Sequence, residues 1–368
     1  MSAAFMKVNP MIEKYNTNKI INSLSHIFTN QKRYDRNIKI DILKGILIIF
    51  VVAAHSYWKF RKIIFWFHMP AFFIISGYLI LIPDKADEKN WLCRKFKNLL
   101  IPHLSYTLLI GLFNIGSGIK DYLIHIERCL VFVEKAAGVY WFIPVLFLSQ
   151  AMIVFIENRI KNTKLKLLIY SAMYVTGIIE SLVLIPPNTI NVPTYTMLPF
   201  NIDVCLLAIP YMIIGYYLRQ NIERIKPFFE SESGSICIII SSFALSFILF
   251  YFKAFDWLTL DLKYSQYKNI IFDLVCPVVF TSLLWLISSF ISKIWLGKVL
   301  SYIGERSIII MYLHLLIRDK LIVKLLSEEY SIFIYAFIVI VICLLFDFII
   351  SCFPSIAPYF SVKAGRKQ

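Results

Sequence analysis

Residues 41–56 read DILKGILIIFVVAAHS, and this stretch decides the kind of fold that the chain adopts. Asp41 and Lys44 open an apolar run that continues without another charge as far as His55. A helix rises about 21 Å between Asp41 and His55, at about 1.5 Å per residue, and the hydrocarbon core of a bilayer is about 30 Å thick. The stretch is therefore typical of a helix that enters a membrane near Asp41 and carries a histidine into the far half.

The rest of the chain is built in the same way. Of its 368 residues, 59% are hydrophobic and 17% are charged, whereas about a quarter of the residues in a soluble domain are charged. Because lipid offers no partner to an unpaired backbone N–H, and the apolar runs are too long for barrel strands, we expect helices. The sequence predicts an all-α, polytopic integral membrane helical bundle of about ten transmembrane helices. The expected spans are 40–58, 63–83, 98–119, 139–156, 167–186, 197–218, 235–255, 270–292, 307–325 and 331–353.

The charge distribution orients the bundle. The formal net charge is +15, which in a soluble protein would suggest a nucleic-acid partner. Here Lys and Arg lie between the apolar runs, roughly twice as many on the side of the N-terminus as on the other, which is the positive-inside pattern. We therefore expect membrane lipid and no nucleic acid as partner, with both termini cytoplasmic. The predicted division is an N-terminal arm (1–37), a single transmembrane domain (38–353) and a cytoplasmic tail (354–368).

Two histidines lie at the facing ends of the first two expected spans. His55 closes the first span and His68 opens the second, so antiparallel neighbours bring the two imidazoles together in the outer half of the membrane. A histidine at that depth is either a functional group or a neutral, hydrogen-bonded packing residue. Imidazole is the side chain best suited to general base catalysis at neutral pH. The seven cysteines show no CxxC pair and no zinc-like spacing, so neither a disulfide framework nor a metal is expected.

A basic run precedes the third expected span. Residues 91–103 read WLCRKFKNLLIPH, which places Arg94, Lys95 and Lys97 on the cytoplasmic side. One interpretation is membrane topology alone. The other is a docking patch for a phosphorylated donor, because Arg and Lys both bind phosphate oxygens.

These segments together resemble the integral-membrane acyltransferase 3 family, and within it the fucose 4-O-acetylase-like group that modifies bacterial surface polysaccharides. The resemblance is dense over residues 36–142 and reappears near 301–314. The residues that carry it are Asp41, Lys44, Gly45, His55 and Ser56; FHMP and FF within 67–73, with Ser76, Gly77 and Tyr78; the basic run ending at Pro102; Tyr140, Trp141 and Phe142; and IGERS with YLH within 303–314.

The resemblance implies a reaction and a location. It implies an O-acyltransferase of the bacterial inner (plasma) membrane that takes an acyl group, acetyl by default, from cytoplasmic acetyl-CoA or another acyl-CoA. The acceptor is a sugar hydroxyl of a surface or capsular polysaccharide or of its lipid-linked precursor. No tightly bound cofactor is implied, and the oligomeric state is left open.

The resemblance also implies roles for individual residues. The essential histidine of the family falls on His55, the expected general base. Lys44 stands where many members have Arg, and Arg94, Lys95 and Lys97 reproduce the paired arginines of the family only in part; these four are the expected donor-binding residues. His68, Ser76 and Tyr140 are candidates to stabilise the developing oxyanion, whereas His314 matches the family pattern and is interpreted as structural.

A transporter or flippase for a lipid-linked saccharide or small solute is the alternative, because it would also combine about ten spans with scattered intramembrane charges. The enzyme is favoured because the polar groups gather around His55 and His68 beside a cationic patch, instead of forming two matching broken segments. Buried carboxylates would either orient an imidazole, pair with Arg318, or lie at a span boundary. The charges concerned are Glu180, Asp203, Asp273, Arg318 and Asp347.

Overall fold

The protein is described here by a computed structural model that covers residues 37–56, 61–113, 118–132, 138–185, 198–323 and 331–360. Residues 1–36 of the predicted N-terminal arm and 361–368 of the predicted tail lie outside the described residues. From Lys39 onward the described chain forms one unit, and nearly all of it is helical.

Over the described residues, each predicted span overlaps a helix, two consecutive helices, or a helix and its adjoining turn. In chain order these are α2 (Ile38–Ala54), α3 (Lys62–Phe65) with α4 (His68–Leu79), α5 (Glu88–Leu112), α7 (Phe142–Arg159), α8 (Thr163–Leu184), α9 (Ile202–Gln220), α11 (Glu232–Tyr251), α13 (Phe272–Ile291), α15 (Ser307–Ile317) with the π-helical turn η7 (Arg318–Ile322), and α17 (Ile332–Ser351).

The remaining elements are short. The helices are η1 (Lys85–Asp87), α6 (Ile119–Glu127), the π-helical turn η3 (Arg128–Phe132), η5 (Pro199–Asn201), α10 (Ile222–Glu230), α12 (Ala254–Trp257), η6 (Leu262–Tyr264), α14 (Trp295–Glu305) and α18 (Ala357–Phe360). Strands β1 (Leu260–Asp261) and β2 (Gln266–Tyr267) pair antiparallel, with Leu260 opposite Tyr267.

Among the described residues, seven helical segments are long and apolar enough to cross a membrane, or eight if α14 and α15 with η7, bent by 75°, count as one span. The helix α2 has 17 residues, and the first half of α5 carries the basic run, so neither meets that criterion by itself. The all-α polytopic bundle is therefore confirmed, and the number ten stays a prediction.

The outward faces of the helices are apolar. Phe250 of α11 is 75% exposed and Phe333 of α17 is 82% exposed, and both helices carry further exposed aliphatic and aromatic side chains. A water-soluble protein rarely exposes contiguous apolar surface of this kind. These faces fit a lipid surround, where apolar side chains need no burial against other helices.

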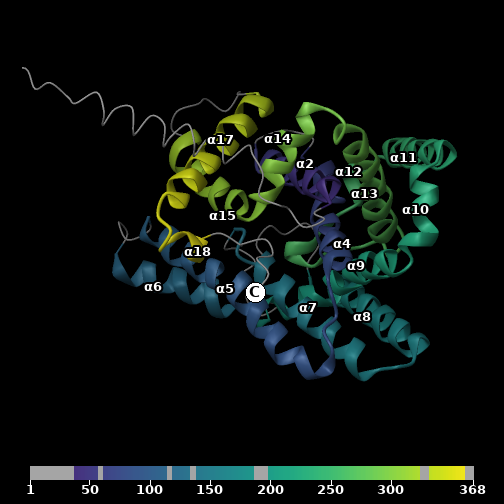
Figure 1. The fold of residues 1–368 in the computed structure, drawn as a ribbon, viewed down its shortest axis with the longest axis horizontal. Helices are drawn as coiled ribbons and strands as arrows, with labels where there is room; N and C mark the ends of the chain where they lie inside the picture. Colours follow the sequence, from purple (N-terminus) through teal and green to yellow (C-terminus); the bar gives the residue numbers. More distant parts are fainter. Residues whose placement is uncertain are drawn as a thin grey trace, which may run out of the picture. The chain divides into compact units, whose positions relative to one another are not determined.

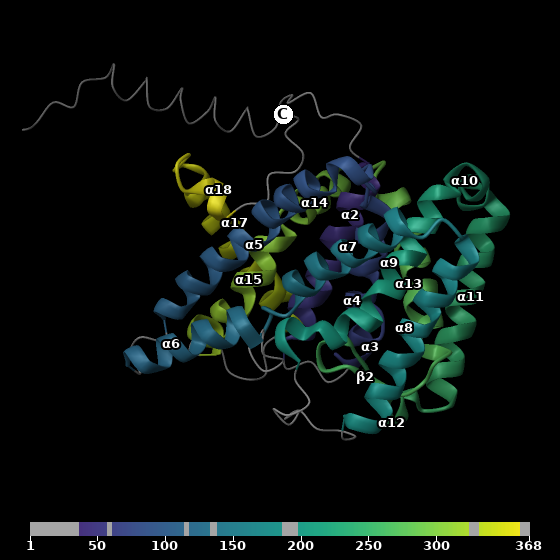
Figure 2. The same ribbon diagram turned by 90° about the horizontal axis from the view of Figure 1, so that it is seen from below.

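Two pairs of helices meet backbone to backbone. A Cβ added at Gly215 of α9 would collide with the carbonyl oxygen of Ile74 in α4, and one added at Gly304 of α14 would collide with that of Asp41 in α2. Figure 1 shows α4 beside α9, and α14 beside α2. In Figure 2, α7 and α8 also lie next to α9. Small residues permit this approach, and it fixes the ends of α2 and α4 that lie away from their histidines.

The close contact at Gly215 gives a stability prediction. We expect Gly215→Ala to lower the free energy of unfolding by about 1–3 kcal/mol, because the backbone carbonyl of Ile74 cannot move aside. Gly177→Ala in α8 is the matched control, since the atoms nearest its new Cβ belong to the side chains of Leu206 and Leu207 in α9 and not to a backbone carbonyl. Unfolding in sodium dodecyl sulfate checks both variants, and equal losses would contradict the backbone contact.

Candidate active site

Three histidines gather at the end of α2. His55 follows the last residue of α2 and is half-buried, whereas His68 of α4 and His314 of α15 are buried. The ring centroids of His55 and His314 lie 4.9 Å apart. The ring of Phe65 packs against both imidazoles, with its centroid 6.4 Å from that of His55 and 5.3 Å from that of His68. The predicted neighbours His55 and His68 therefore flank one phenyl ring, and His314, interpreted from the sequence as structural, is in direct contact with His55.

Each of these imidazoles has the same backbone hydrogen bond. A carbonyl oxygen can only accept, so in each ring Nδ1 carries the hydrogen and donates it to the carbonyl four residues earlier. In the neutral ring this leaves Nε2 as the free acceptor, which is the form that a general base needs. Nε2 of His314 is buried and has no hydrogen-bond partner among the described residues. The bonds run from His55 to Val51 (2.8 Å), from His68 to Ile64 (2.7 Å) and from His314 to Ile310 (3.0 Å).

Two arginines hold the end of α2. Arg318 of η7 donates to the carbonyl oxygen of His55 at 3.0 Å, and Arg61 donates to that of Ser56 at 3.0 Å. Cations at a helix C-terminus satisfy its free carbonyls and favour the helix dipole. Arg318 also pairs with Asp319 at 2.6 Å. The guanidinium of Arg318 thus ties the backbone of His55 to the helix that carries His314.

Tyr140 belongs to a second cluster. Its ring lies 5.9 Å from His103 and 5.8 Å from Tyr312, and its buried hydroxyl has no partner among the described residues. The hydroxyl of Tyr312 donates to Nδ1 of His103 at 2.8 Å, because Nε2–H of His103 donates to the carbonyl of Cys129 at 3.3 Å. Tyr312 and His314 are two residues apart and so face opposite sides of α15. The cluster around Tyr140 therefore lies across α15 from His55.

Ser76 is not brought to the histidines. Its hydroxyl donates to the carbonyl oxygen of Phe72 at 2.7 Å. Ser76 stands about 12 Å along the helix from His68, at about 1.5 Å per residue. Ser76 is thus placed for packing within α4 and not for contact with a substrate group bound beside His55.

The four expected donor-binding cations lie at the starts of two helices. Lys44 of α2 pairs with the buried Asp41 at 3.5 Å, and Arg94 of α5 pairs with Asp87 at 3.0 Å. Hydrogen bonds from Asn90 and Arg94 hold the pKa of Asp87 below its usual range. Lys97 is exposed, and the half-buried Lys95 lies over a tryptophan ring of the same helix at 5.4 Å. Arg94 and Lys97 are thus the cations of this run that are exposed to a ligand.

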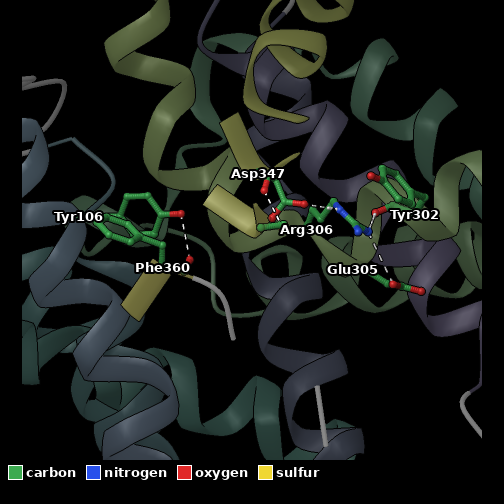
Figure 3. A network of polar contacts seen from close by, with 7 residues as sticks. Tyr106, Tyr302, Glu305, Arg306, Asp347 and Phe360 are labelled. Atoms are coloured by element: carbon green, nitrogen blue, oxygen red, sulfur yellow. Dashed lines mark hydrogen bonds and ion pairs between the residues drawn. The ribbon is translucent and has the colours of Figure 1, made fainter. Parts of the chain in front are cut away.

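The carboxylate of Asp347 pairs with Arg306. Arg306 lies at the bend between α14 and α15, and its Nε is 2.7 Å from the carboxylate of Asp347 in α17 (Figure 3). Its guanidinium also lies 3.5 Å from the ring of Tyr302 and 3.7 Å from the carboxylate of Glu305. The pairing of Asp347 with Arg318 that the sequence left open is not the one observed.

Two other predicted intramembrane carboxylates lie at helix starts. Asp203, in the first turn of α9, accepts a hydrogen bond from Ser265 at 3.0 Å. Asp273, in the first turn of α13, accepts one from the backbone N–H of Asn269 at 2.8 Å. A carboxylate is favourable at a helix N-terminus. Both residues therefore hold helix ends, which agrees with the boundary alternative of the sequence analysis.

Part of the predicted C-terminal tail packs against α5. The hydroxyl of Tyr106 donates to the carbonyl oxygen of Phe360 at 3.0 Å, and the two rings lie 5.2 Å apart (Figure 3). The four-residue helix α18 thereby contacts the same helix that carries His103. The contact was not evident from the sequence, because the residues involved are distant along the chain.

Comparison with known proteins identifies the family. A family model described as an acyltransferase domain (Acyl_transf_3) matches residues 37–353. The nodulation protein NolL of Sinorhizobium fredii is 34% identical over 131 residues, which cover 30% of this chain and 33% of NolL. The aligned region is thus a third of the length of that relative. No solved structure matches the chain. The chain belongs to this acyltransferase family, which confirms the resemblance to the acyltransferase 3 family seen in the sequence and the expected acyltransferase class.

The Arg306–Asp347 pair gives a second stability prediction. We expect Asp347→Asn to lower the free energy of unfolding by about 2 kcal/mol or more, because the partly buried guanidinium of Arg306 loses the nearer of its two carboxylate partners. In a double-mutant cycle with Arg306→Gln, the coupling should exceed about 1 kcal/mol.

The exposed pair of Arg94 and Asp87 is the control for this cycle. Its coupling, from Arg94→Gln and Asp87→Asn, should stay below about 1 kcal/mol, as for surface ion pairs. Unfolding in sodium dodecyl sulfate measures both cycles. If the losses of stability from Arg306→Gln and Asp347→Asn simply add in the double variant, the ion pair itself makes no contribution to stability.

Proposed function

We propose that this acyltransferase moves an acyl group, acetyl by default, from cytoplasmic acyl-CoA to a sugar hydroxyl on the far side of a bacterial inner membrane. The acceptor is a surface or capsular polysaccharide or its lipid-linked precursor, and His55 is the general base. The observation that carries the proposal is the half-buried imidazole of His55, whose Nδ1 donates to Val51 and whose Nε2 is therefore free to accept a proton.

The chemistry requires such a group. A sugar hydroxyl is a weak nucleophile at neutral pH, so its proton must be removed as the oxygen attacks the thioester carbonyl. The hydroxyl proton passes to Nε2 of His55, the new C–O bond forms and the C–S bond breaks. The thiolate of coenzyme A then takes the proton, which returns His55 to its neutral form and leaves all atoms and charges balanced.

The donor has to reach His55 from the cytoplasmic side. Lys44 lies about 16 Å before His55 along α2, at about 1.5 Å per residue. The long pantetheine arm of acyl-CoA would bridge this distance between the phosphates and the thioester. Lys44, Arg94, Lys95 and Lys97 supply cationic groups for the phosphates of the donor. Of these, Arg94 and Lys97 are exposed, and they carry the strongest case for phosphate contact.

The developing oxyanion needs hydrogen-bond donors. Neutral His68 has already committed its only N–H to Ile64, so it can serve the oxyanion only when protonated. Ser76 and Tyr140 lie farther from His55, along α4 and across α15. The guanidinium of Arg318, which already donates to the backbone of His55, is the better placed donor for this role.

Family membership favours an enzyme over the transporter or flippase considered from the sequence. The contact among His55, Phe65 and His68 supports the same choice, because it concentrates titratable groups at one point of the bundle. Transport by itself would not require a free imidazole nitrogen there.

Removal of the base gives the first activity prediction. We expect His55→Ala to reduce alkali-labile acyl groups on the surface glycan about 100-fold or more. Mass spectrometry of the glycan before and after mild alkali, in a deletion strain that carries each variant, is the measurement. His125→Ala is the control, since His125 lies in α6 and belongs to the cluster around Tyr140. Normal acylation by His55→Ala at equal membrane abundance would refute the assigned base.

The basic run gives the second activity prediction. Arg94→Ala with Lys97→Ala should raise the KM for acetyl-CoA about tenfold and change kcat little, because two phosphate contacts are lost before the chemical step. Lys161→Ala with Lys164→Ala is the matched control: it removes two exposed charges on the same predicted side, one between α7 and α8 and one in the first turn of α8. An unchanged KM in the first double variant would assign the basic run to topology alone.

A further inference from the structure

His314 is a buried titratable group that the proposed mechanism does not yet use. It is fully buried in α15, yet its ring contacts that of His55 with centroids 4.9 Å apart and planes at 65°. A histidine that serves only packing would be expected to satisfy both ring nitrogens, because an unpaired buried acceptor costs free energy. Nε2 of His314 has no partner among the described residues.

The hydrogen bonds limit what His314 can do. Its Nδ1–H donates to Ile310 as that of His55 donates to Val51, so two neutral rings in contact each present an acceptor nitrogen. Two acceptors cannot bond to each other. Once one ring gains a proton at Nε2, however, its new N–H can donate, while Nε2 of the other, neutral ring can still accept.

The surrounding charges favour one proton over two. The titratable and charged groups that face this pair are His68 from α4 and Arg318 and Asp319 from η7. Arg318 is cationic and donates to the backbone of His55, so a second positive charge on the pair would be costly. Asp347 of α17 is occupied by Arg306 at the other end of α15. The site is therefore suited to accept a single proton, which is what one turnover delivers.

We propose that His314 is a positioning partner of the base, and that the proton taken from the acceptor hydroxyl is held between the Nε2 atoms of His55 and His314. The inference rests on the proposed role of His55. The hydroxyl proton leaves as the new C–O bond forms, stays on the pair while the C–S bond breaks, and then passes to the coenzyme A thiolate. No group beyond the two substrates is consumed.

Leucine and glutamine at position 314 separate this role from packing. The amide oxygen of Gln accepts a hydrogen bond from protonated His55, whereas Leu fits an apolar site and accepts none. We expect His314→Leu to lower kcat about 10- to 100-fold, the loss of one hydrogen bond to a charged group, and His314→Gln to lower it less. The acid limb of the kcat/KM pH profile should move to lower pH in His314→Leu, because protonated His55 loses its stabilising acceptor.

The assay uses inside-out membrane vesicles from a deletion strain that expresses the full-length variants. They are supplied with radiolabelled acetyl-CoA and an ionophore that equalises pH across the membrane, and label in alkali-labile glycan esters is counted. His125→Leu and His125→Gln are matched controls and should keep the pH profile of the unmodified protein. If His314→Leu does not reach the membrane, His314→Met replaces it as an apolar side chain of similar volume.

The outcomes distinguish this inference from the proposed function. An apolar variant as active as His314→Gln, with an unmoved acid limb, would overturn the role of His314. If His55→Ala is inactive in the same vesicles, the proposed function stands despite that result. If His55→Ala is active, both proposals are wrong.

Discussion

The arrangement of the site depends on one kind of hydrogen bond, from the Nδ1 of a histidine to the carbonyl oxygen four residues earlier. Inside a membrane bundle this bond uses a partner that the histidine's own helix supplies, so its geometry does not depend on a neighbouring helix or on water. It also sets the tautomer, because the carbonyl can only accept. His55, His68 and His314 all make it. The same end of the bundle thus collects three imidazoles whose acceptor nitrogens face away from their own helices.

Close helix contacts determine where those imidazoles lie. The start of α2 is fixed against α14 by Gly45 and Gly304, and the later half of α4 against α9 by Gly77 and Gly215. Both contacts lie at the cytoplasmic ends expected from the charge distribution, away from the histidines. Because a helix is stiff, fixing one end by backbone contact places the other end as well. A glycine far from the chemistry therefore helps to position His55 and His68.

The sequence predicted the helical bundle well and the site in part. Long apolar runs bounded by charge require helices in lipid, and over the described residues each expected span overlaps a helical segment. The approach of His55 to His68 was predictable because a short link joins their helices. The contact of His55 with His314 was not, since more than 250 residues separate them and hydropathy gives no information on which faces of distant helices meet. The YLH motif marks His314 as part of the family pattern, but from the sequence this histidine is interpreted as a packing residue of the core.

The helix α15 is held by an arginine contact at each of its ends. Near its start Arg306 pairs with Asp347 of α17, and beyond its end Arg318 donates to the backbone of His55. His314 lies between these arginines, on the face opposite the tyrosine that bonds to His103. A displacement of α15 along its axis would therefore strain the ion pair at one end and shift the orientation of His55 at the other. The ion pair at one end of this helix and the arginine–carbonyl hydrogen bond at the other hold a fully buried imidazole beside the group that it is proposed to assist.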